Sequence, residues 1–338
     1  MDIIEKNCKK RISYINFLKF IGITCIIIAH SGAPSWLMML RSFDVPLMVI
    51  LSAFLCAKSF KKNKGNNLSI SDYYIKRVKR LVVPTWLFLI IYFSLSYIST
   101  GHSYDFQYYI ASFCLTRYGI GYVWIILIYL YSSLLIPLYS KIKTYKASVV
   151  CVIAVYILYE ILYYFKVGTN NAIVDTTFYY IVPYGVLTYL GYYYSHAKRP
   201  HKTGIILISF VLFVTMGIYY WIKTGAPQLV QIAKYPARIY YLSFGIMVSS
   251  ILLQICEKVE LKIFDSNFVR YISEHSMWIY LWHILVLTLY NAIGLPQIWY
   301  IKFSTVYFTS VFIVFVFNKI LDLVKNKKIQ KLFTYFRG

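Results

Sequence analysis

The sequence predicts an all-α polytopic membrane protein with about ten transmembrane helices and with both termini in the cytoplasm. Hydrophobic residues make up 59% of its 338 positions and only 14% are charged, whereas soluble globular proteins carry about 25% charged residues. So few charged side chains cannot cover the water-facing surface of two soluble domains. The mean hydropathy of +0.61 agrees. These observations exclude the soluble, fibrous and disordered classes.

Ten apolar segments are long enough to cross a membrane, because a transmembrane helix needs roughly 20 mainly apolar residues. No soluble domain, repeat or low-complexity linker separates them, so we expect residues 1–338 to form a single membrane domain. Residues 325–338 would be a short basic cytoplasmic tail. The first segment contains Lys19 and lacks a clean small-residue cleavage site, which argues against a signal peptide. The segments lie near residues 13–33, 43–60, 81–99, 120–140, 147–166, 174–194, 204–222, 237–256, 271–291 and 298–321.

The lysine and arginine residues set the expected orientation, because cytoplasmic loops are enriched in them. With the N-terminus inside, most of the 35 basic residues fall in cytoplasmic segments. This alternation supports ten spans and a multi-pass protein of the cell membrane. The net charge of +23 is then explained by contact with anionic membrane lipid, and nucleic acid is not an expected partner. The basic segments are 1–12, 58–80, 141–146, 198–202, 258–270 and the stretch from Lys319.

The first predicted span carries charged or titratable side chains, which cost several kcal/mol within a membrane unless they are paired or hydrated. Lys19 lies near its entry, and helical rise places His30 about 21 Å from Asn16, toward the outer half of the bilayer. A histidine there either anchors the helix end at the interface or serves as a general base. Asp44, across a short outer loop, either orients that imidazole as a triad acid does or forms an ordinary surface ion pair with Arg41.

A basic pair stands at the cytoplasmic entry of the third predicted span. Arg77 and Arg80 are three residues apart, so on a helix they share one face. Two neighbouring guanidinium groups suit a phosphorylated ligand. The alternative is anchoring to anionic lipid, worth about 1 kcal/mol per basic residue.

Further polar and aromatic residues in the spans are candidates for lining a polar cavity. Glu160 and His283 fit that interpretation, or equally a hydrogen bond between helices, worth only about 0.6 kcal/mol on average. The six cysteines are scattered without metal-ligand spacing, so no metal site is expected. The candidate cavity residues are Asn16, Glu160, Trp124, Tyr280 and His283.

Four motifs follow one another along the chain: the block from Asn16 to His30, the segment from Val45 through Ser52 to Phe54, the arginine pair followed by Pro84, and the late block from Ser276 through Tyr280 to His283. By the order and spacing of these motifs the chain resembles the integral-membrane acyltransferase family 3 over nearly its whole length. The segment from Tyr122 to Pro137 is also similar to one of the family. At Asn16, Lys19 and Ala53 the family often has aspartate, arginine and glycine instead.

The resemblance implies a bacterial O-acetyltransferase, an enzyme that transfers groups other than amino-acyl groups. An acetyl or similar short acyl group would pass from cytoplasmic acetyl-CoA to a hydroxyl of a cell-surface polysaccharide or glycolipid. His30 would be the general base, Arg77 and Arg80 would hold the CoA phosphates, and Ser52 or Lys19 would stabilise the oxyanion. The alternative class is a transporter or flippase of an envelope glycan or its precursor, although the internal repeats common in transporters are not evident.

Overall fold

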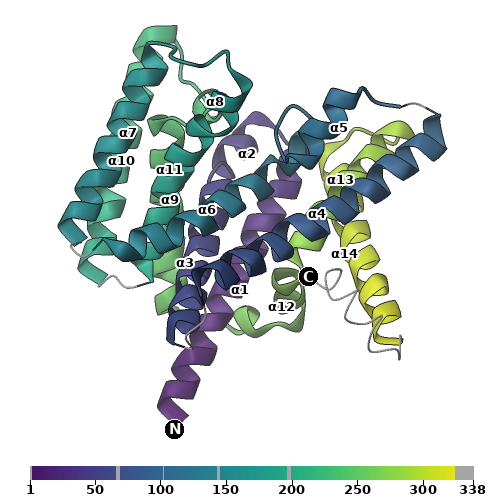
Figure 1. Ribbon diagram of the computed structural model, residues 1–338, viewed down its shortest axis with the longest axis horizontal. Coiled ribbons are helices and arrows are strands. Elements are labelled where there is room, and N and C mark those ends of the chain that lie inside the picture. The colour runs from purple at the N-terminus through teal and green to yellow at the C-terminus, as the bar shows by residue number, and fades with distance from the viewer. Residues whose placement is uncertain are drawn as a thin grey trace. The chain divides into compact units, whose positions relative to one another are not determined.

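The computed structural model describes residues 2–65, 69–101, 103–142, 145–195, 199–259 and 261–323, and these residues form helices and their connecting loops (Figure 1). The predicted all-α class is therefore confirmed for the described part of the chain. The predicted basic tail, 325–338, lies outside the described residues.

The described residues divide into two compact units, each built from segments that are distant in the sequence. The first unit draws on Met1–Asp44, Val82–Tyr109 and Leu253–Gly338, and the second on Val45–Leu81 and Ile110–Leu252. One boundary falls inside α4 (Ile70–Thr100), a helix that continues through Pro84. Proline is tolerated in membrane helices because neighbouring groups satisfy the backbone carbonyl that it leaves unbonded.

The first unit gathers the first and last helices of the chain. α1 (Asp2–His30) packs against α12, α13 and α14, and α13 also packs along α14. Figure 1 shows these last two helices side by side in its yellow-green part. Besides α1 and the second part of α4, this unit contains α2 (Ser35–Leu40), η3 (Lys262–Asp265), α12 (Asn267–Glu274), α13 (Ser276–Ala292) and α14 (Trp299–Leu323).

α1 ends at His30 because the next residues favour a turn. Gly32 has a φ of +78°, a left-handed conformation that glycine adopts without steric cost. The hydroxyl of Ser31 donates to the carbonyl of Ile27 at 2.8 Å, so one of the carbonyls left unbonded at the helix end is satisfied. His30 therefore stands in the last turn, where the chain leaves the helix.

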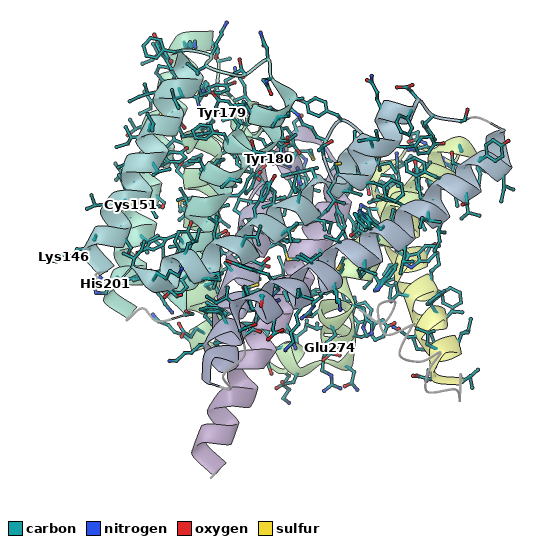
Figure 2. All side chains as sticks on the ribbon, in the orientation of Figure 1. Lys146, Cys151, Tyr179, Tyr180, His201 and Glu274 are labelled. Carbon is teal, nitrogen blue, oxygen red and sulfur yellow. The ribbon has the colours of Figure 1, made fainter. Side chains whose placement is uncertain are left out.

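The second unit is organised around α9 (Phe178–Tyr194), which packs against α6, α7 and α8 and has most of its side chains buried. Figure 2 shows Lys146 of α7 and His201 of α10 toward one end of this unit and Tyr179 and Tyr180 of α9 toward the other. Besides α9 and the first part of α4, the helices that lie wholly or partly in this unit are α3 (Asp44–Gly65), α5 (Phe106–Phe113), η1 (Gly121–Val123), α6 (Trp124–Lys141), α7 (Tyr145–Tyr164), α8 (Ala172–Thr176), α10 (Arg199–Thr224), η2 (Val230–Ala233) and α11 (Ile239–Lys258).

Two glycines let α3 approach its neighbours closely. A Cβ at Gly191 of α9 would lie 2.3 Å from the carbonyl oxygen of Ile50, and a Cβ at Gly245 of α11 would lie 2.4 Å from the ring of Pro46. Small residues at such positions are typical of membrane helix interfaces, where packing and not hydrophobicity drives association.

Eight helices of the described residues are long and apolar enough to cross a membrane, against ten predicted spans. The difference lies at segments 174–194 and 271–291. Each of them is broken into a short helix and a 17-residue helix, α9 or α13, whose length of about 26 Å is slightly below the roughly 30 Å hydrocarbon core. The chain is thus a multi-pass membrane protein, and the count of ten and the orientation stay predictions.

Candidate active site

Two histidines join the end of α1 to α13. Nδ1 of His30 lies 2.8 Å from Nε2 of His283, and the two rings are stacked with centroids 5.1 Å apart and planes 8° apart. The His283 side chain is fully buried, whereas His30 is half-buried. Of the two imidazoles, His30 is therefore the more exposed.

The position of His283 is set by its own helix. Its Nδ1 is hydrogen-bonded to the backbone carbonyl oxygen of Tyr280, one turn earlier in α13, and its ring lies 4.9 Å from that of Tyr280. The sequence singles out Tyr280 and His283 as cavity candidates but contains no signal for their pairing with His30. The sequence leaves two interpretations of His283, a residue that lines a cavity or a hydrogen bond between helices, and the structure shows the hydrogen bond.

The opposite half of α1 is tied to α12. The hydroxyl of Ser273 donates to Oδ1 of Asn16 at 3.0 Å, and Nζ of Lys19 donates to the carbonyl oxygen of Ser273. Lys19 precedes His30 by about 16 Å along the helix axis, so the structure does not bring Asn16 or Lys19 together with His30. Their bonds position α1 against α12.

Asp44 forms an ion pair with Arg41, through Oδ2 and Nη1. The expected surface location is wrong, because the two side chains are only 1% and 3% exposed. Asp44 also begins α3, where a negative charge is favourable beside the positive end of the helix dipole. Nδ1 of His30 is hydrogen-bonded to His283. An orienting role for Asp44 stays a prediction.

In the second unit, Arg77 and Arg80 lie on one continuous stretch of α4. The Arg77 guanidinium lies over the ring of Tyr73 at 5.3 Å, and the Tyr73 hydroxyl donates to the carbonyl of Ser133 at 3.1 Å, which ties this part of α4 to α6. Arg80 is exposed. None of the ion pairs of the described residues involves Arg77 or Arg80. A site for an anionic ligand requires positive charges that are not already neutralised.

The second unit also holds Ser52, Trp124 and Glu160. Ser52 is half-buried on α3. Trp124, the first residue of α6, packs edge-on against Tyr180 of α9, which Figure 2 labels, with ring centroids 5.6 Å apart.

Glu160 links α7 to the start of α11. Its Oε2 pairs with Nε of Arg238 at 2.5 Å, while its Oε1 accepts from the hydroxyl of Tyr156 at 2.7 Å and from the backbone N–H of Ile239 at 3.0 Å. These contacts agree with the interpretation of Glu160 as a hydrogen-bonded link between helices. The ion pair with Arg238 adds to that link and is not evident in the sequence.

One of three comparisons with known proteins finds a match. A family model described as an acyltransferase domain matches residues 12–319, a range that includes His30, the arginine pair and His283. Neither the comparison with curated proteins nor the comparison with solved structures finds a match. Because the family model covers most of the sequence, the chain belongs to the acyltransferase family 3 and is a membrane acyltransferase.

Proposed function

We propose that the protein transfers an acetyl or similar short acyl group from acyl-CoA to a hydroxyl of a cell-surface polysaccharide or glycolipid, with His30 as the general base. The observation that carries this proposal is the placement of His30 within a chain of this family. The imidazole stands in the last turn of α1, half-buried, with one ring nitrogen held by a second histidine. A base needs both access to the proton that it removes and a defined orientation.

The reaction needs little beyond such a base, because a thioester is already activated toward attack. His30 accepts the proton of the acceptor hydroxyl while the hydroxyl oxygen attacks the thioester carbonyl carbon. The tetrahedral oxyanion then collapses, the carbon–sulfur bond breaks, and CoA leaves as a thiolate that takes up a proton. A route through an acyl-histidine would use the same imidazole as a nucleophile.

The remaining roles are proposed for an arginine pair and a serine. Arg77 and Arg80 are proposed to bind the phosphates of CoA, since paired guanidinium groups form strong charge-assisted hydrogen bonds with phosphate. Ser52 is proposed to donate a hydrogen bond to the oxyanion. Lys19 is a poor donor for this role because its Nζ is bonded to the Ser273 carbonyl far along α1 from His30.

The test is acyl transfer by the purified protein in proteoliposomes. Acetyl-CoA is supplied with octyl glycosides of glucose, galactose, mannose and N-acetylglucosamine, and released CoA thiol and acetylated glycoside are measured. His30→Ala should lose about 10²–10⁴-fold in rate. His275→Ala removes another half-buried histidine, whose Nδ1 bonds to the Tyr271 carbonyl, and it should stay active. Normal turnover by His30→Ala would contradict the assignment.

The competing proposal is a transporter or flippase of an envelope glycan without covalent chemistry. The same assay separates the two, because an enzyme releases CoA thiol in proportion to acceptor acetylated. A transporter would move glycan across the membrane with no consumption of acetyl-CoA. Glycan movement without thiol release would favour that alternative.

A further inference from the structure

We propose that His283 is a positioning residue that keeps the ring proton of His30 on Nδ1, so that Nε2 of His30 is the nitrogen that acts as the base. The proposal rests on the proposed function, in which His30 removes the acceptor proton. It adds the residue that selects which of the two nitrogens does so.

The direction of each hydrogen bond follows from the Tyr280 carbonyl. A carbonyl oxygen only accepts, so Nδ1 of His283 must carry a proton to bond to it. In a neutral imidazole the other nitrogen, Nε2, then carries a lone pair. That nitrogen lies 2.8 Å from Nδ1 of His30, which must be the donor. The lone pair of His30 is thereby assigned to Nε2.

Burial fixes the protonation state on which this direction depends. A charged His283 would carry protons on both nitrogens and could not accept from His30. Its side chain is 0% exposed, and an isolated charge buried in that way is strongly unfavourable. His283 is therefore neutral. The two hydrogen bonds, from His30 to His283 and from His283 to the Tyr280 carbonyl, then have a single consistent arrangement of protons.

The same bond helps His30 when it takes up the acceptor proton. The imidazolium that forms donates from Nδ1 to the His283 lone pair, and hydrogen bonds from charged donors are roughly twice as strong as neutral ones. A carboxylate in this place would bind the imidazolium more strongly, but a second buried ion within the membrane is expensive. A neutral histidine orients the base without adding a charge.

Two amide substitutions separate positioning from folding. In His283→Gln the amide reaches the place of the ring Nε2, so its oxygen still accepts from His30. In His283→Asn the shorter amide occupies the place of Nδ1, near the Tyr280 carbonyl, and leaves His30 without this acceptor. We expect His283→Asn to lower kcat by about 10²–10⁴-fold with an unchanged KM for acetyl-CoA, as loss of the correct tautomer does in triad enzymes. His283→Gln should stay within about tenfold of the unsubstituted protein.

A second measurement needs no acceptor. Diethyl pyrocarbonate acylates the imidazole nitrogen that carries the lone pair, and mass spectrometry of peptides reports the modification of each histidine. His275, which is half-buried with Nδ1 on the Tyr271 carbonyl, serves as internal reference. The rate for His30 relative to His275 should fall several-fold in His283→Asn and recover in His283→Gln.

The outcomes distinguish this proposal from the proposed function. If His30→Ala is inactive while His283→Asn matches the unsubstituted protein in kcat and in His30 modification, His283 does not position the base. If both amide variants fold and lose activity equally, the acceptor at Nε2 is not what matters, and the proposal is overturned. If His30→Ala retains activity, the proposed function fails, and the modification ratio alone decides whether His283 sets the proton on His30.

Discussion

Gly191→Ala should destabilise the protein, because α9 has no room for a methyl group where it meets α3. The added Cβ would lie 2.3 Å from the carbonyl oxygen of Ile50 and 2.7 Å from Cβ of Ala53, whereas ordinary contact begins at 3.4 Å. The two helices must therefore separate by about 1 Å, and overpacking of this kind costs about 1–3 kcal/mol. A backbone oxygen cannot rotate away, so we expect the upper end of that range. The better helix propensity of alanine returns about 1 kcal/mol, which leaves a net loss of about 2 kcal/mol.

The matched control is the same substitution where a methyl group meets nothing. Gly204 lies inside α10, and no atom is within 4 Å of the position its Cβ would take, so Gly204→Ala should leave stability unchanged or raise it by up to about 1 kcal/mol. Thermal unfolding in detergent, followed by size-exclusion chromatography of the remaining monodisperse protein, measures both variants. At roughly 2–4 °C per kcal/mol, Gly191→Ala should unfold about 4–8 °C lower. An unfolding temperature equal to or above that of Gly204→Ala would refute the packing argument.

Three further predictions concern charged residues. Arg77→Ala and Arg80→Ala should each raise KM for acetyl-CoA about 10–150-fold with kcat unchanged, since each loses a hydrogen bond to a charged group worth about 1.5–3 kcal/mol; initial-rate kinetics that show the same KM would assign the pair to lipid anchoring. Asp44→Asn leaves Arg41 buried without its carboxylate and should lower stability by about 3–5 kcal/mol; loss of activity at an unchanged unfolding temperature would instead support an orienting role. Glu160→Gln should cost about 1–3 kcal/mol of stability while the folded variant keeps its kcat, and a lower kcat would place Glu160 at the reaction.

The helical fold could be predicted because membrane spans leave a local signal. Runs of about 20 apolar residues separated by basic loops mark them directly, and the eight long helices follow those runs. Segments 174–194 and 271–291 are different. Their composition is that of a span, but the breaks after Thr176 and Glu274 leave a 17-residue helix in each. A hydropathy window averages over such a break, so sequence alone does not show it.

The candidate site could be predicted only residue by residue. His30 stands out because a titratable group within a span is costly, and Arg77 and Arg80 stand out by their spacing. The partner of His30 lies 253 positions away, and helical periodicity indicates which face of a helix a residue occupies but not which helix meets it. For the same reason the sequence indicates Glu160 as a costly charge within a span but does not indicate its pairing with Arg238.

The tie between the first helix and the late part of the chain has a consequence for biosynthesis. α1 leaves the ribosome first, yet Ser273 and His283, which bond to its two halves, are made only after most of the chain. At about 5–20 residues per second, His283 emerges roughly 13–50 s after His30. During that interval His30 is without the hydrogen-bond partner that, on the proposed mechanism, sets the proton on its ring. On the proposed mechanism, a polypeptide truncated before α12 would lack the partner of His30 and would be inactive.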